Sequence, residues 1–190
     1  MAINTLTASC VVVVVTLLSL SAGAHVSCPA TCSCVESDST NSGRRHHLAV
    51  ACSSGELTSL PAKLPTSAAS LDVSGNRLEL LDGASLPHTG VHGLYTANFS
   101  RNRIVTIATE SFSRWSNLVS LDLSANRLTS IDHGTFRGAA QTSLQKLDLS
   151  GNRLTEVDGG FSGMAKLFRS VMSSRYNNNR MYLNNSVVLN

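Results

Sequence analysis

Apolar residues recur along the chain in four copies of one pattern. Each copy is an eleven-residue stretch with apolar side chains at positions 1, 4, 6 and 11 and asparagine at position 9. The stretches are 68–78, 94–104, 118–128 and 144–154. Their asparagines lie 26, 24 and 26 residues apart. Four copies in phase indicate an internal repeat, which points to a solenoid built from stacked units.

The middle of each copy alternates apolar and polar residues, which predicts a short β-strand with one buried face. Equivalent strands of successive repeats would form a parallel sheet, and each repeat would bury its apolar side chains against its neighbours. We expect Trp115 to fill the core. Further apolar residues recur in phase: Leu81, Ile107, Ile131 and Val157, then Leu86, Phe112, Phe136 and Phe161.

The four asparagines predict a structural ladder. The chain must turn sharply after each strand, which leaves backbone polar groups inside the fold that need partners. A side-chain amide both donates and accepts hydrogen bonds. We therefore interpret the asparagines as structural, and we expect the arginine after each of them to lie on a solvated rim. The ladder residues are Asn76, Asn102, Asn126 and Asn152.

The first 24 residues have the pattern of a secretory signal peptide. An apolar run of about ten residues is too short to span a membrane, and the small residues Ala22, Gly23 and Ala24 suit a cleavage site. No lysine or arginine precedes the run, and an uncleaved anchor is the alternative. We predict a signal peptide over 1–24, a secreted protein and no membrane span.

The cysteines after the signal peptide form one local cluster. They are Cys28, Cys32, Cys34 and Cys52. An even number in a secreted chain predicts two disulfides, with three possible pairings. Zinc is the alternative because His46 and His47 lie nearby, but the cysteines lack the paired C-x2-C spacing of zinc sites. We predict no metal site.

These features resemble the extracellular leucine-rich-repeat family. The cysteine cluster, followed by Leu57, Leu60 and Pro61, is similar to the N-terminal cysteine-rich cap of Toll-type receptor ectodomains, Slit-like guidance proteins and many secreted repeat proteins. The resemblance implies that Cys28 pairs with Cys34 and Cys32 with Cys52. It also implies an α/β fold: a right-handed leucine-rich-repeat solenoid with a concave parallel sheet and a mostly irregular or 3-10 convex side.

On this basis we expect the cap over 25–60, four repeats over 61–167, and a degenerate fifth repeat or polar tail over 168–190. The long loop between Cys34 and Cys52 includes Arg44 and Arg45. We expect it to be a solvated hairpin tip, with contact to a heparin-like or acidic partner as the alternative. No cysteine-rich cap follows the repeats, so we expect a fragment of a longer receptor, a tail that folds back, or end-to-end self-association.

Charge and motifs narrow the function. The chain of 190 residues has a formal net charge of +3, which is too small to indicate nucleic-acid binding. No G-x-S-x-G, H-E-x-x-H or phosphate-loop motif occurs in the sequence, so we predict no enzyme activity and no cofactor.

We predict instead a non-enzymatic module that recognises an extracellular protein ligand or co-receptor through the solenoid surface. The alternative is a truncated signalling-receptor ectodomain or a soluble matrix, adhesion or immune factor. Energetically important interface residues are often tyrosine or arginine, which singles out Tyr95 and Arg101 among the exposed strand positions. Gln145 and Lys146 are further candidates.

Two N-x-S sequons predict glycan sites at Asn98 and Asn184. Asn98 lies between the inward-facing Ala97 and Phe99, so its side chain should point out of the sheet. A glycan there would cover the middle of the concave face and move protein binding to an edge or to the convex side. An unused sequon is the alternative.

Overall fold

The computed structural model describes residues 28–37, 47–53, 55–83, 85–87, 91–155, 161–164, 181–183 and 187–189. The predicted signal peptide, the basic loop with His46, and Asn184 lie outside these residues. Most of the expected fifth repeat or tail lies outside them as well.

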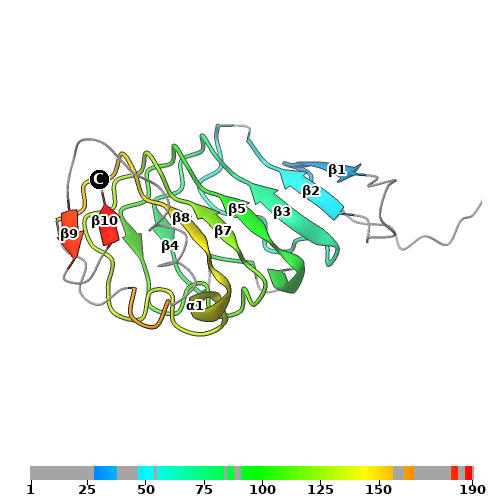
Figure 1. The fold of residues 1–190 in the computed structure, drawn as a ribbon. Coiled ribbons are helices and arrows are strands. Elements are labelled where there is room, and N and C mark those ends of the chain that lie inside the picture. Colours follow the sequence, from blue (N-terminus) through cyan, green and yellow to red (C-terminus); the bar gives the residue numbers. More distant parts are fainter. Residues whose placement is uncertain are drawn as a thin grey trace, which may run out of the picture.

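The repeats stack side by side along a curved sheet (Figure 1). From β2 to β8 the strands are parallel, with one register shift between Leu48 and Ala49 where β2 meets β3. From β3 onward they are in register: Leu71 is paired with Ala97, Ala97 with Leu121, and Leu121 with Leu147. The predicted α/β solenoid is confirmed. In sheet order its strands are β1 (Ser33–Ser37), β2 (His47–Ala51), β3 (Ala68–Asp72), β5 (Thr96–Asn98), β7 (Ser120–Asp122) and β8 (Lys146–Asp148).

At its N-terminal end the parallel sheet gains one antiparallel strand from the cap. β1 pairs antiparallel with β2, from Ser33 opposite Ala51 to Ser37 opposite His47. β1 and β2 are consecutive neighbours and form a hairpin, as the hairpin tip expected between Cys34 and Cys52 implies; the tip itself lies outside the described residues. The cap therefore ends the sheet with a strand of opposite direction.

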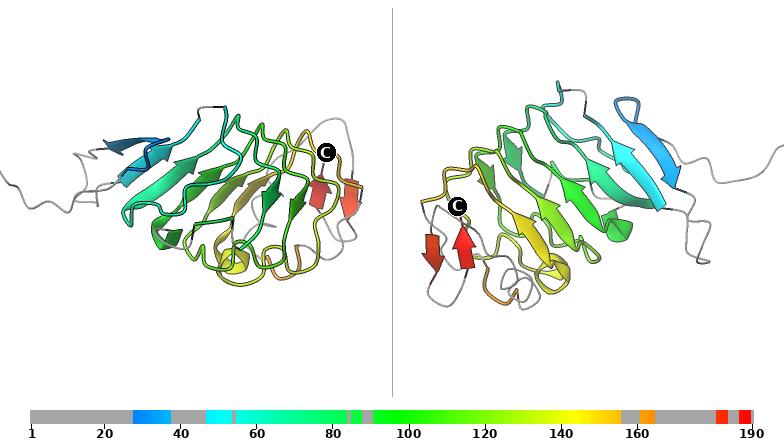
Figure 2. Two further views of the ribbon diagram at one scale, coloured as in Figure 1. Left: turned by 180° about the vertical axis from the view of Figure 1, so that it is seen from behind. Right: turned by 45° about the horizontal axis from the view of Figure 1, so that its top comes forward.

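Short elements and turns form the other side of the solenoid (Figure 2). The 3-10 helix η1 covers Val91–Gly93 and the helix α1 covers Ala139–Ser143. A pair of two-residue parallel strands, β4 (Leu80–Leu81) and β6 (Thr106–Ile107), was not predicted from the sequence. Near the C-terminus, β9 (Met181–Leu183) and β10 (Val187–Leu189) pair antiparallel with each other in a separate sheet.

The core lies between the sheet and the turns, and its centre is aromatic. Phe112 contacts Phe99, Trp115 and Phe136, with ring centroids 6.4, 5.4 and 5.8 Å away. The row continues from Phe136 to Phe161 at 6.1 Å. Trp115 is 1% exposed, so its predicted place in the core is confirmed. Because Phe112, Phe136 and Phe161 come from successive repeats, each repeat completes the core of the next.

The ladder asparagines join neighbouring repeats through shared backbone groups. Asn102 Nδ2 donates to the carbonyl oxygens of Val73 (2.9 Å), Phe99 (3.0 Å) and Ser100 (3.2 Å). Its Oδ1 accepts the N–H of Leu78 at 3.1 Å. The Phe99 carbonyl also accepts from Asn126 Nδ2, so one carbonyl oxygen accepts hydrogen bonds from the asparagines of two successive repeats.

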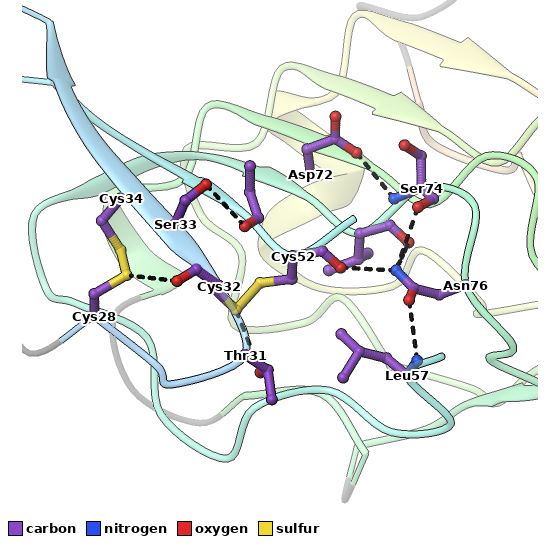
Figure 3. The surroundings of a disulfide bond; sticks show 12 residues. Cys28, Thr31, Cys32, Ser33, Cys34, Cys52, Leu57, Asp72, Ser74 and Asn76 are labelled. Carbon is purple, nitrogen blue, oxygen red and sulfur yellow. Dashed lines mark hydrogen bonds between the residues drawn. A yellow bond between two sulfur atoms is a disulfide. The ribbon is translucent and has the colours of Figure 1, made fainter. Parts of the chain in front are cut away.

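The ladder starts in the cap, beside the disulfides (Figure 3). Cys28 is bonded to Cys34 and Cys32 to Cys52, with S–S distances of 2.09 and 2.06 Å. This is the pairing that the family resemblance implies. The Cys52 carbonyl accepts from Asn76 Nδ2 at 2.9 Å. The bridges span 6 and 20 residues, and chain entropy gives them about 2 and 3 kcal/mol of stabilisation.

Candidate protein-binding face

Backbone hydrogen bonds between neighbouring repeats hold the residues at the start of strands β5, β7 and β8 in place. The N–H of Tyr95 donates to the carbonyl of Ala69 at 2.7 Å, and its carbonyl accepts from the N–H of Val119 at 2.9 Å. The Val119 carbonyl accepts in turn from the N–H groups of Gln145 and Lys146, both at 2.9 Å. Tyr95, Val119 and Gln145 therefore hold equivalent places in neighbouring repeats, and Lys146 holds the next place along the chain. The backbone of Tyr95 and Val119 is bonded to the repeats on both sides.

The side chains of this row form one exposed surface, which we call the strand-start patch and define as Tyr95, Val119, Gln145 and Lys146. Tyr95 is 55% exposed, Gln145 and Lys146 are exposed, and Val119 is half-buried. One strand separates Tyr95 from Gln145, which places their backbones about 10 Å apart. Three of the four candidate binding residues thus lie together.

Arg101 lies apart from the patch. It follows Tyr95 by six residues along β5 and its turn, which is about 20 Å of extended chain. Its φ is 56°, in the left-handed region, and the equivalent residues Gly75, Ala125 and Gly151 have φ values of 67°, 53° and 68°. A side chain costs about 1 kcal/mol in this conformation, so repeat geometry imposes a strained backbone on Arg101 at the opposite edge.

A row of acidic and amide side chains crosses the sheet face between these edges. Asp72, Asn98, Asp122 and Asp148 are paired in register. Each side-chain oxygen accepts the N–H of the serine two residues later, at 2.9, 3.0, 2.8 and 2.9 Å. Sequence reasoning missed this row, although the repeated D-x-S and N-x-S spacing could have indicated local turns that need an acceptor oxygen.

The row gives a structural setting for the Asn98 sequon. Asn98 uses Oδ1 in its turn, and its Nδ2 makes no hydrogen bond within the described part of the chain. The side chain is half-buried, between the buried Ala97 and Phe99. Alternation along the strand therefore places it on the open face, where an attached glycan would leave the turn intact.

We expect Asn98→Asp to abolish an Asn98 glycan and to keep the turn, because aspartate makes the same turn in three other repeats; its cost is the small repulsion from Asp72 and Asp122 on the neighbouring strands. Asn98→Gln should also lose the glycan but lower the free energy of unfolding by about 1 kcal/mol, since its longer side chain loses the turn. Peptide mapping of protein from a secreting host and urea unfolding measure these effects. Unmodified wild-type Asn98 would contradict the glycan prediction.

The described residues offer little for other chemistry. Among them, no group of three or more histidine, cysteine, aspartate or glutamate side chains is arranged to hold a metal ion. Within the same residues, no helix is both long and apolar enough for a membrane crossing. An exposed ion pair joins Arg137 to Glu110 at 4.0 Å, and exposed pairs of this kind contribute at most about 1 kcal/mol.

Comparison with known proteins agrees with this architecture. The sequence profile of the family described as leucine rich repeat matches residues 92–142 and 116–169. Tsukushi of Xenopus tropicalis is 33% identical over 125 residues, which are 64% of this chain and 35% of that protein. Tsukushi-A of Xenopus laevis is 36% identical over 85 residues, 45% of this chain and 24% of that protein. The chain is an extracellular leucine-rich-repeat protein with an N-terminal cysteine-rich cap.

The leucine-rich-repeat chain is also similar to a solved receptor structure, titled as the crystal structure of a TLR13–ssRNA13 complex. The similarity covers 53% of this chain and 14% of that one, at 33% identity and a TM-score of 0.49. The chain spans about a quarter to a third of the length of the two Tsukushi relatives. Its disulfides suit an oxidising, extracellular setting.

Proposed function

We propose that this leucine-rich-repeat protein binds an extracellular protein, a ligand or co-receptor, through the strand-start patch and without enzyme activity. Leucine-rich-repeat proteins are protein-interaction modules. The observation that carries the proposal is the exposure of Tyr95, at 55%, on a backbone held by hydrogen bonds from both neighbouring repeats. A rigidly held tyrosine offers a large contact area at little entropic cost, which is why tyrosine is enriched among energetically dominant interface residues.

The surroundings of Tyr95 indicate the chemistry of the partner. Val119 adds apolar surface beside the ring, and Lys146 adds a cation one strand further on. A complementary surface would offer a pocket for the ring and a carboxylate for Lys146. The patch lies where the strands begin, so a glycan on Asn98 in the middle of the sheet leaves it open.

The experiment compares Tyr95→Ala with Leu80→Ala. Leu80 is also a large exposed apolar residue, but it lies in β4, outside the patch. Proximity labelling on cell surfaces identifies proteins that the wild-type chain contacts, and binding of each purified candidate is then measured. We expect Tyr95→Ala to weaken the genuine complex about thirtyfold and Leu80→Ala to change it less than threefold. Equal effects of the two variants would contradict the proposal.

A further inference from the structure

Arginines line the edge of the solenoid opposite the strand-start patch. We call Arg77, Arg103, Arg127 and Arg153 the arginine row. Each follows a ladder asparagine, and all four are exposed. They occupy the turns after β3, β5, β7 and β8, which lie in sequence along the molecule because those strands are in register (Figure 1).

Backbone hydrogen bonds fix the spacing of the row. The N–H of Arg103 donates to the carbonyl of Leu78, the residue after Arg77, at 2.9 Å. The same bond recurs from Arg127 to Ile104 and from Arg153 to Leu128, each at 2.9 Å. Every arginine is therefore stacked on the preceding repeat, about 5 Å from the last at the backbone. Arg101, two residues before Arg103, adds a fifth guanidinium to the same edge.

These positive charges are not neutralised within the described residues. None of the five guanidinium groups forms an ion pair or a side-chain hydrogen bond with another described residue. Glu56 has the equivalent place in the cap, since the next residue, Leu57, donates to Asn76 as Leu78 donates to Asn102. The four residues that follow Glu56 at this place in the repeats are all arginines, and neighbouring positive charges repel each other. A ligand that supplied anions along this edge would relieve that repulsion.

We propose that the arginine row binds a sulfated glycosaminoglycan chain laid along the solenoid axis. The guanidinium fork suits oxyanions bidentately, and regular spacing along a straight edge suits a linear polymer with many charges. The extracellular location puts such chains within reach. A single-stranded nucleic acid would need aromatic side chains for base stacking; the exposed aromatic residue among the described large hydrophobics, Tyr95, lies at the other edge.

The test measures binding of the full secreted chain to immobilised heparin across a range of salt concentrations. The double variant Arg103→Gln/Arg127→Gln removes the centre of the row. Its matched control, Arg114→Gln/Arg137→Gln, removes the same charge from exposed residues elsewhere. We expect the row variant to bind about tenfold more weakly and to reduce the salt slope by about 2, while the control stays within twofold of wild type.

Three further arms make the result specific. Tyr95→Ala should leave heparin binding unchanged, which separates this inference from the proposed protein-binding function. Arg175→Gln/Arg180→Gln should retain most of the binding. Equal losses in the row and control variants, complete loss in the tail variant alone, or equal binding of desulfated heparin, single-stranded DNA or polyglutamate would overturn the proposal.

Discussion

Asn102→Ala should lower the free energy of unfolding by about 4 kcal/mol. Asn102 is 7% exposed and makes four side-chain hydrogen bonds to backbone groups. The loss is uneven. The carbonyls of Val73 and Phe99 keep their bonds from Asn76 and Asn126, but the buried N–H of Leu78 is left without a partner.

Urea unfolding followed by far-ultraviolet circular dichroism measures this loss. Asn117→Ala is the matched control, because Asn117 is exposed and its Nδ2 makes a single bond to the His92 carbonyl. We expect the control to cost less than about 1 kcal/mol. If both variants lost the same stability, the side-chain bonds of Asn102 would not be the stabilising feature that their burial indicates.

Phe112→Ala should cost about 3–5 kcal/mol, the usual range for a buried phenylalanine replaced by alanine. Phe112 is 0% exposed, and its ring contacts rings from three segments: Phe99 directly after β5, Trp115 in the same turn and Phe136 in the next repeat. Removing it leaves a cavity where two repeats meet, so the damage extends to both sides of the interface.

Differential scanning calorimetry should show the Phe112→Ala midpoint lowered by about 10 °C, since 1 kcal/mol corresponds to a few degrees in a domain of this size. Val105→Ala is the control, because Val105 is a large hydrophobic residue that remains exposed. We expect its midpoint to move by no more than about 2 °C. A midpoint for Phe112→Ala within that range would show that the aromatic row contributes little to stability.

The repeat determined how much of the fold could be read from the sequence. A pattern that returns four times in phase predicts stacked parallel strands, because each copy repeats the same buried positions. β1 belongs to the cap, outside the periodic part, and the expected hairpin was the sequence's indication of its direction. The β4–β6 pair escaped the repeat pattern, because these strands have two residues each, too few for alternation to be visible.

The candidate site was harder to predict than the fold. Whether two exposed residues lie at the same edge of the sheet depends on where each strand begins and ends, which the residue types do not reveal. Tyr95, Gln145 and Lys146 lie together at the edge where the strands begin. Arg101 was selected from the sequence on the same grounds as Tyr95, but it lies at the opposite edge, in the turn after β5. The arginines after the ladder asparagines were expected to form a solvated rim. They are exposed, yet the bonds from Arg103 to Leu78 and from Arg127 to Ile104 give them a regular spacing that no single repeat could reveal.

The aromatic core has a spectroscopic consequence. Trp115 is the single tryptophan of the chain, and it is packed between Phe99 and Phe112, so native indole fluorescence arises from one dry position in the middle repeats. Its emission maximum should move to longer wavelength only when that interface admits water. The cap is separated from this position by the first repeat, so fraying of the cap alone should leave the tryptophan emission unchanged. The intrinsic emission of this protein therefore follows the opening of its centre, independently of its ends.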